Sequence, residues 1–332
     1  MTNRYQNSVA IAGFGSIGRR HARLLKQMWP DTDIVLVRSG SGVTWPEEEL
    51  AIATVKTPEE ALEFGVRAAI ISSPASFHLS QANDFISGGV PVLVEKPLSN
   101  CLEGAIKFEK LVSSLGLPVL VGYTFRHSPV LNFYLACLKD PSMGAPISAR
   151  IECNTYLPSW RPGQDFRSTV SARSDLGGGV LLELSHELDY ANLFFGPFST
   201  VEARTLSETS LNLDVETLAR LKLKSQTGVE IEVILDFYNR TESRKCVLQM
   251  STGVLILDLL AQKVVWVPRD GGREEWHFPH DRDDIYVAQL QHFFDCINGL
   301  VAPVASVQDG IAALTLAVAA KVSNKNGRVV AI

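Results

Sequence analysis

Two segments that lie far apart in the sequence carry side chains able to hold and move a proton. Lys96 stands between Glu95 and Pro97 at the end of a short apolar run. A lysine accepts a proton or orients a hydroxyl group where a neighbouring positive charge disfavours its ammonium form, and Glu95 could fix its position. An ordinary ion pair at the end of a strand is the alternative interpretation of Lys96.

The second segment follows three glycines, residues 177–179, and has a helical pattern. At about 100° per residue, Glu183, His186 and Tyr190 fall on the face opposite an apolar stripe. Because imidazole titrates near neutrality, His186 suits the role of general base, with Glu183 orienting it and Tyr190 assisting. The same face could simply be solvated. Glu183 and His186 could also be metal ligands, but no third His or Cys lies at a recognisable spacing, so we expect no metal.

Two further pairs of side chains could bind a substrate. Tyr123 and Arg126 follow a short apolar run, and a guanidinium there could bind a hydroxyl or carboxylate group. Trp160 and Arg161 precede the three glycines, where an aromatic ring could stack on a sugar and the arginine could bind its polar groups. Each of these side chains could instead anchor its own loop or pair at the surface.

A glycine-rich motif begins directly after the first apolar run, and its residues are Gly13, Phe14, Gly15, Ser16, Ile17 and Gly18. In this G-x-G-x-x-G pattern the first glycine permits a tight turn, the second lets the backbone approach a pyrophosphate, and the third allows close helix packing. The free N–H groups of the following helix point at the phosphates. Because the motif follows a strand and opens a helix, it predicts a dinucleotide site; a tight turn without a ligand is the alternative.

Arg38 bears on the choice of dinucleotide. It stands twenty positions beyond Gly18, where an NAD site normally places an acid that accepts hydrogen bonds from the ribose 2′-hydroxyl. Arginine at this position, followed by Ser39, suits a 2′-phosphate, so the sequence favours NADP(H), with NAD(H) possible. A surface arginine that stacks on adenine without touching a phosphate is the alternative.

Ser73, Pro74 and His78 follow another apolar run. Polar residues at the carboxyl ends of parallel strands line the ligand crevice of open α/β sheets, and His78 could contact the ribose or cap the next helix. The next strand end would place Glu95 and Lys96 beside the nicotinamide ring of the same cofactor.

The elements that must position these residues indicate two domains. Residues 1–125 alternate short, continuously apolar runs with amphipathic segments, which predicts an α/β domain with a doubly wound parallel sheet. Residues 126–332 are richer in alternating β segments and predict an α+β substrate domain with an open, mostly antiparallel sheet, interrupted by one helix at about 179–195. A closing helix at about 306–323 could pack back on the first domain.

Composition excludes several classes of protein. The 332 residues exceed one ordinary core, and 46% hydrophobic with 20% charged residues is typical of a globular chain. A net charge of -5 argues against a nucleic-acid partner. No apolar stretch is long enough to cross a membrane, and residues 1–8 lack a signal-peptide core. The five cysteines are scattered, as expected for free thiols in a reducing cytoplasm.

The motifs together resemble the glucose–fructose oxidoreductase / inositol dehydrogenase / rhizopine catabolism (Gfo/Idh/MocA) family over nearly the whole chain. The resemblance is carried by the glycine motif, Glu95-Lys96-Pro97, residues 122–126 and the helix with His186 and Asp189. It implies an N-terminal Rossmann domain and a C-terminal sheet that mediates assembly into a homodimer or homotetramer. It also implies reversible, NAD(P)-dependent oxidation of a sugar or cyclitol hydroxyl.

The resemblance assigns Lys96 and His186 as the catalytic pair and adds Asp189 to the substrate-binding residues. The family usually has Asp four residues before this histidine, where this chain has Leu182, so Glu183 is the nearest acid. We therefore expect an NAD(P)-dependent oxidoreductase that transfers hydride between a carbohydrate (sugar, cyclitol or activated sugar) and nicotinamide. The alternatives are a self-cycling epimerase or glycoside-cleaving enzyme, and a non-catalytic NADPH-binding regulatory protein.

Overall fold

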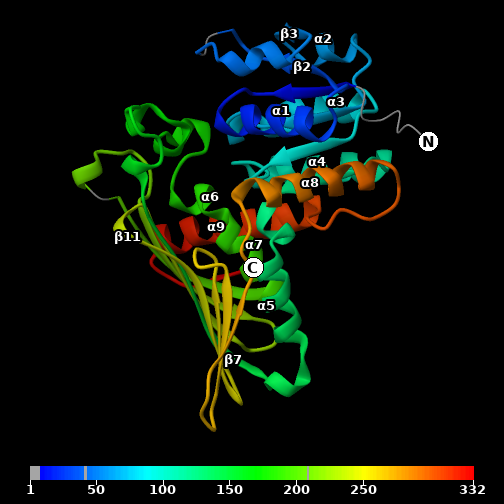
Figure 1. Cartoon of the computed structure of the whole chain (residues 1–332). Helices are drawn as coiled ribbons and strands as arrows, with labels where there is room; N and C mark the ends of the chain where they lie inside the picture. Colours follow the sequence, from blue (N-terminus) through cyan, green and yellow to red (C-terminus); the bar gives the residue numbers. More distant parts are fainter. Residues whose placement is uncertain (1–7, 41–42, 208) are drawn as a thin grey trace. The chain divides into compact units, whose positions relative to one another are not determined.

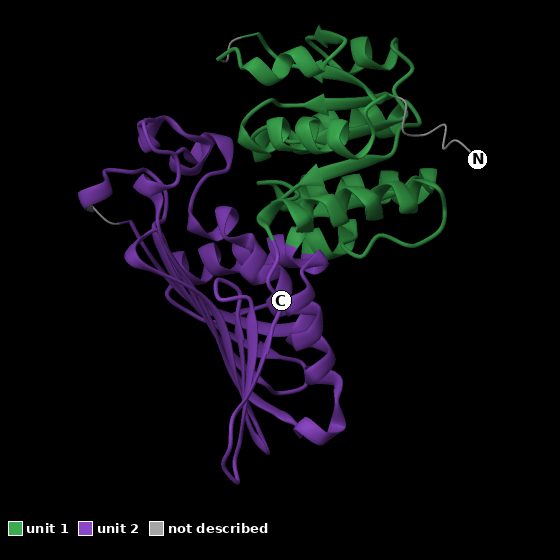
Figure 2. Ribbon diagram, in the orientation of Figure 1, with its two compact units in different colours: residues 1–124, 281–311 green, residues 125–280, 312–332 purple. Residues whose placement is uncertain are grey.

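The computed structural model describes residues 8–40, 43–207 and 209–332 (Figure 1). The chain forms two compact units: Met1–Thr124 with Asp281–Ile311, and Phe125–His280 with Ala312–Ile332 (Figure 2). The segment 281–311, which the sequence led us to place with the C-terminal domain, therefore belongs to the first unit. Its helix α8 (Arg282–Ile297) packs against α1 (Ser16–Met28). The leader prediction for residues 1–8 falls almost entirely outside the described residues.

The first unit contains a six-stranded parallel sheet in the order β3-β2-β1-β4-β5-β6. Its strands are β1 (Ser8–Ala12), β2 (Asp33–Val37), β3 (Ala53–Val55), β4 (Ala68–Ile71), β5 (Val92–Glu95) and β6 (Val119–Gly122). The predicted doubly wound sheet is confirmed. The sequence did not indicate β3, because three half-exposed or exposed residues produce no apolar run.

Helices cover this sheet, which explains its continuously apolar strands. Residues 9–12 of the central strand β1 are all fully buried. Besides α1 and α8 there are α2 (Pro58–Leu62), α3 (Ala75–Ser87) and α4 (Leu102–Leu115), and α3 packs against both α2 and α4. A short 3₁₀ helix, η2 (Pro46–Leu50), packs against α1.

The second unit is built on a nine-stranded sheet in the order β14-β13-β12-β11-β7-β10-β9-β8-β15. Only the central pair β7 and β10 is parallel. Its strands are β7 (Pro146–Tyr156), β8 (Phe198–Leu206), β9 (Leu218–Ser225), β10 (Glu230–Asp236), β11 (Tyr238–Met250), β12 (Gly253–Asp258), β13 (Lys263–Pro268), β14 (Glu274–His277) and β15 (Val330–Ala331). The predicted open, mostly antiparallel sheet is confirmed, and only the edge strands β14 and β15 were missed.

Helices α5 (Pro129–Lys139), α6 (Val180–Glu183) and α7 (Ser185–Phe195) pack against strands of this sheet. In β9 the side chains alternate between buried and exposed, so one face of the sheet meets the core and the other is polar. We expected one continuous helix at 179–195, and this was wrong. Leu184 adopts φ −98° and ψ 34°, which ends α6 before α7 begins.

Helix α9 (Val307–Asn326) begins in the first unit and ends in the second, since the division falls at Ile311. Near its start, a Cβ on Gly310 would lie 2.9 Å from the Leu98 side chain, so only glycine allows this approach. The segment just before α9 is joined to β6, because the Val121 N–H donates to the Ala305 carbonyl at 2.9 Å. The beginning of α9 therefore packs on the first unit.

Candidate active site

The glycine loop of the first unit has the geometry of a phosphate cradle. Gly13 has a φ of +86°, and a Cβ there would overlap the Ser73 backbone. A Cβ on Gly18 would overlap the Gly13 carbonyl oxygen, so neither position accepts a side chain. Around Gly15, by contrast, no described atom lies within 4 Å of the added Cβ position. The loop thus leaves its backbone open at the start of α1, where a helix N-terminus favours an anion.

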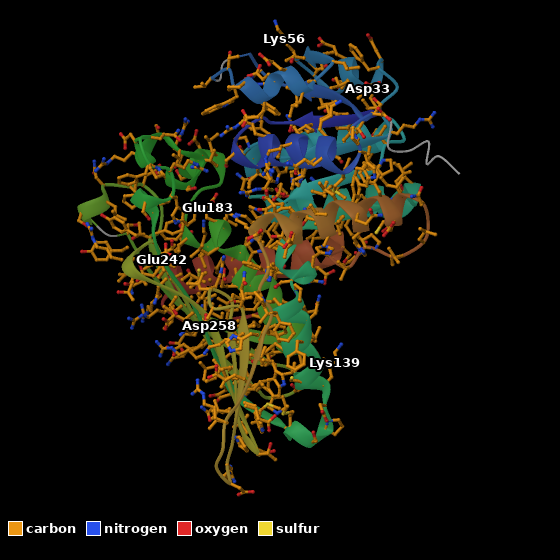
Figure 3. All side chains as sticks on the ribbon, in the orientation of Figure 1. Asp33, Lys56, Lys139, Glu183, Glu242 and Asp258 are labelled. Atoms are coloured by element: carbon orange, nitrogen blue, oxygen red, sulfur yellow. The ribbon has the colours of Figure 1, made fainter. Side chains whose placement is uncertain are left out.

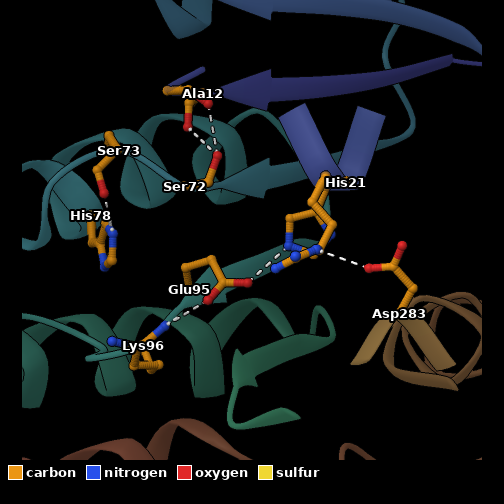
Figure 4. Close-up of polar contacts among 10 residues, drawn as sticks. Ala12, His21, Ser72, Ser73, His78, Glu95, Lys96 and Asp283 are labelled. Carbon is orange, nitrogen blue, oxygen red and sulfur yellow. Dashed lines mark hydrogen bonds and ion pairs between the residues drawn. The ribbon is translucent and has the colours of Figure 1, made fainter. Parts of the chain in front are cut away.

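The end of β4 supports this loop. The Ser72 hydroxyl donates to the carbonyl oxygens of Ala12 and Gly13, at 3.2 and 2.7 Å (Figure 4). The Ser73 hydroxyl donates to Gln81 in α3 at 2.7 Å. Ser72 therefore stabilises the loop itself, whereas the predicted Ser73, half-buried at the strand end, is joined to α3.

His78 lies inside the first unit. Its Nδ1 is 2.8 Å from the Pro97 carbonyl oxygen and its Nε2 is 2.8 Å from that of Ser73 (Figure 4). The side chain is 1% exposed, and burial lowers its pKa. A neutral imidazole donates only one hydrogen bond, so one of these two carbonyls receives it. Of the two roles considered for His78, contact with the ribose does not follow from this geometry; the ring joins the ends of β4 and β5.

Lys96 follows β5 and is half-buried, whereas every other residue of the segment 92–99 is buried. Its backbone N–H donates to Oε2 of Glu95 at 3.3 Å, and its peptide bond to Pro97 is cis. A Cβ on Gly122 of β6 would lie 2.9 Å from the same Oε2, so glycine makes room for the carboxylate. Glu95 is 6% exposed and orients the backbone of Lys96 from within the unit.

His21, which the sequence analysis did not single out, is the main partner of Glu95. Its Nε2 lies 2.8 Å from Oε1 of Glu95, and its ring is fully buried (Figure 4). The ring also meets Tyr286 of α8 edge-on, with centroids 5.8 Å apart. A histidine on the apolar face of α1, three residues after Gly18, was the signal available in the sequence.

Glu183 of α6, labelled in Figure 3, and His186 of α7 are both half-buried. The His186 ring packs on Phe125, with centroids 4.7 Å apart at 55°. Gly179, which precedes α6, has a φ of +103°, and a Cβ there would lie 2.6 Å from a carboxylate oxygen of Glu216. This glycine therefore allows the chain to turn tightly into the segment that carries Glu183 and His186.

Tyr190 does not share this exposure. It is 1% exposed, its hydroxyl donates to Glu187 at 3.2 Å, and burial raises its pKa well above the ordinary value. Tyr190 lies one turn after His186 in the same helix α7, yet it is buried, so the exposed face predicted from the sequence does not extend to it.

Arg126 and Asp189 form a buried ion pair. The guanidinium Nε and Nη2 donate to Oδ2 and Oδ1 of Asp189 at 3.0 and 2.6 Å, and the side chains are 4% and 3% exposed. A buried guanidinium needs a carboxylate partner, and here the protein supplies it. The substrate-binding roles expected of both residues therefore do not follow from the geometry, which instead joins α7 to η3 (Thr124–His127).

A second buried pair, also missed in the sequence, holds α7 to β11. Arg244 donates to both carboxylate oxygens of Glu187, at 2.7 and 3.1 Å, and Glu187 is fully buried. The Arg244 guanidinium also lies 4.6 Å from the Phe125 ring centroid. Phe125 therefore contacts both Arg244 and His186, and residues far apart in sequence determine the position of the imidazole.

The remaining predicted substrate residues have structural contacts or little exposure. Trp160 Nε1 donates to the Thr155 hydroxyl at 2.7 Å and its ring meets Phe237 edge-on, so Trp160 anchors its loop. Tyr123 is 1% exposed, and Arg161 is half-buried. Of this group, Trp160 and Arg161 are both half-buried and keep the partial exposure that binding of a substrate requires.

Arg38, at the end of β2, is already paired. Its Nη1 contacts a carboxylate oxygen of Glu48 in η2, and its Nη2 donates to the Val43 carbonyl at 2.8 Å. The guanidinium also lies 5.9 Å from the ring of Phe14 in the glycine loop. Ser39, next in the chain, is exposed.

Residues 8–40, 43–207 and 209–332 contain neither a metal-binding cluster nor a membrane-spanning helix. No three His, Cys, Asp or Glu side chains there are placed to hold a metal ion, and no helix is long and apolar enough to span a bilayer. All five cysteines are free thiols.

The fold and the glycine loop define an oxidoreductase with an NAD-binding Rossmann domain. A family model described as an oxidoreductase family with an NAD-binding Rossmann fold matches residues 7–123, and the model of its C-terminal alpha/beta domain matches residues 142–332. The chain therefore belongs to the Gfo/Idh/MocA oxidoreductase family, as the motifs predicted.

Relatives and solved structures agree with this assignment. The chain is 24% identical over 338 residues to scyllo-inositol 2-dehydrogenase (NAD(+)) of Bacillus subtilis (strain 168), covering 97% of this chain and 95% of the relative. It is 25% identical to 1,5-anhydro-D-fructose reductase of Ensifer adhaerens, over 76% of each chain. The crystal structure of myo-inositol 2-dehydrogenase from Lactobacillus plantarum superimposes with a TM-score of 0.82 at 20% identity, covering 98% of this chain and 99% of that one.

Proposed function

We propose that the protein transfers hydride between a CH–OH carbon of a carbohydrate and a nicotinamide dinucleotide. One combined observation within the first unit carries the proposal. The glycine loop leaves its backbone open, and Lys96 is half-buried at the end of an otherwise buried strand segment. The names of the relatives, which are cyclitol and sugar dehydrogenases and reductases, support a polyhydroxylated substrate.

The residues of this chain would bind, orient and deprotonate the substrate. Bound nicotinamide supplies the acceptor for the hydride that leaves the carbinol carbon. We propose Lys96 and His186 as the residues that bind the substrate hydroxyl, one of them accepting its proton as the C–H bond breaks. Glu95 and His21 orient the backbone of Lys96, and Phe125 supports the His186 ring.

Glu183 is the residue we propose as the partner of His186, in place of the family's usual aspartate. It is half-buried three residues before the histidine, whereas Glu187 and Asp189 of the same segment are buried. Glu183 is thus the acid of this segment that can polarise an imidazole or bind a hydroxyl.

A screen of sugars and cyclitols with NAD+ and NADP+, followed by nicotinamide absorbance, tests the proposal. We expect cofactor reduction with at least one polyol. Product without net absorbance change would identify a self-cycling epimerase or glycoside-cleaving enzyme instead. Dinucleotide binding with no hydride transfer to or from any carbohydrate would indicate a regulatory NADPH-binding protein.

We further propose that two copies associate through the polar face of the nine-stranded sheet. Across β9 and β10, Lys222 faces Glu232 and Lys224 faces Glu230, and Arg150 on β7 pairs with Glu232 at 3.2 Å. Such an alternating arrangement of charges is complementary to a second copy of itself. Light scattering should report a dimer or tetramer, and a monomer at micromolar concentration would contradict this assembly.

The free cysteines favour a reducing compartment, which we take to be the cytoplasm.

A further inference from the structure

The ion pair of Arg38 and Glu48 determines which groups would contact the adenosine ribose of the cofactor. Arg38 occupies the position that contacts the ribose 2′ substituent in dinucleotide sites of this kind. In the structure its guanidinium is bound by the Glu48 carboxylate and by the Val43 carbonyl, within the first unit. The side chains are 12% and 20% exposed, so the pair is partly accessible from solvent.

Glu48 is held in place by more than its ion pair. Its Oε1 accepts a hydrogen bond from the Trp45 backbone N–H at 2.7 Å. This bond and the contact with Arg38 hold the pKa of Glu48 below its ordinary value, so the carboxylate is ionised at neutral pH. The geometry therefore presents a fixed negative charge beside the arginine.

The short helix that carries Glu48 has a second attachment to the glycine-loop helix. The Arg19 guanidinium of α1 lies 3.9 Å from the Trp45 ring centroid and donates to Glu47 at 3.0 Å. These contacts join η2 to the first turn of α1, so the position of Glu48 does not depend on Arg38 alone.

We propose that Glu48 makes the protein prefer NAD(H) to NADP(H), with its carboxylate acting as the acid that the end of β2 lacks. A carboxylate accepts hydrogen bonds from a ribose hydroxyl, whereas it repels a doubly charged 2′-phosphate. Both of its contacts fall on Oε1, and among residues 8–40, 43–207 and 209–332 no group bonds to Oε2. The inference rests on the proposed function and reverses the preference for NADP(H) drawn from Arg38 alone.

Binding of NAD+ and NADP+, measured separately by isothermal titration calorimetry on the full chain, tests the inference without requiring a substrate. We expect the wild type to bind NAD+ more tightly. Glu48→Gln retains an oxygen for the Trp45 N–H but removes the charge, and should shift the affinity ratio towards NADP+ by about tenfold. Glu49→Gln is the matched control, because Glu49 is exposed one residue away and the charge change is the same; its ratio should stay at the wild-type value.

The double variant Glu48→Gln with Arg38→Gln shows whether loss of the Glu48 charge acts by freeing the Arg38 guanidinium. If Glu48 acts by neutralising Arg38, the gain in NADP+ affinity disappears when Arg38 is also replaced. Thermal unfolding of each variant checks that the fold is retained. A wild type that prefers NADP+, or an unchanged ratio in Glu48→Gln, would overturn the inference while leaving the proposed function standing. Binding of neither dinucleotide would overturn both.

Discussion

The buried carboxylates of the two units have different kinds of partner. In the first unit Glu95 meets the His21 imidazole, and the adjoining Lys96 remains half-buried at the strand end. In the second unit Glu187 and Asp189 each meet an arginine through two hydrogen bonds. Because each guanidinium forms two hydrogen bonds with a buried carboxylate, these two pairs hold α7 to η3 and to β11.

The charge of a side chain, read from the sequence, therefore does not separate catalytic groups from structural ones. Lys96 and Arg126 both follow a parallel strand and both looked able to bind a hydroxyl group. Burial and the identity of the partner distinguish them, because Arg126 is 5% exposed and paired while Lys96 keeps part of its surface. Replacing Lys96, Asp189 and Arg126 tests this difference.

Replacing the lysine should have the largest effect on activity. Lys96→Ala removes the amine that holds the substrate hydroxyl, so turnover should fall by about 10²–10⁴-fold while calorimetry still detects dinucleotide binding. Lys110→Ala, at an exposed position of α4, is the control and should retain wild-type turnover. Unchanged turnover in Lys96→Ala would refute the catalytic assignment.

Replacing Asp189 should have its largest effect on stability. Asp189→Ala leaves the buried Arg126 charge without its carboxylate, which should reduce the free energy of unfolding in urea by about 3–5 kcal/mol. The exposed pair of Arg173 and Asp175 provides a control, and Asp175→Ala should change stability little.

A double variant sharpens this test of the second unit. Replacing Arg126 and Asp189 together by leucine removes both charges and should recover much of the lost stability. If Asp189→Ala were as stable as the wild type but bound substrate poorly, the pair would serve substrate binding and the contrast between the units would fail.

The smallest expected effect is the pH dependence that His78 adds to stability. Burial lowers its pKa, with Glu95 and Lys96 acting in opposite directions nearby. The folded protein therefore binds this proton more weakly than the unfolded chain does. The contribution is fully present above the unfolded value of about 6.5 and is lost as pH falls below it, by at most about 1.4 kcal/mol per pH unit.

His78→Gln should flatten the slope of unfolding free energy against pH between about pH 5 and 6.5. Equal slopes in the wild type and His78→Gln would show that His78 does not titrate on unfolding in this range.

The local patterns of the sequence determined most of the fold and the dinucleotide half of the site. Continuous apolar runs predicted five of the strands in the parallel sheet, and alternation predicted the core strands of the second sheet, because these periods report burial directly. The glycine motif was equally readable, since Gly13 and Gly18 meet backbone atoms that leave no room for a Cβ.

Only the tertiary structure decided which polar side chains face outward and which pair with one another. Tyr190 is buried although it lies one turn after the half-buried His186, and the partners of Glu95, Arg126, Arg38 and Glu187 lie between 10 and 74 residues away in the sequence. Residue types at one position cannot reveal a partner that chain folding brings from elsewhere, because an ion pair depends on distance and burial rather than on sequence spacing.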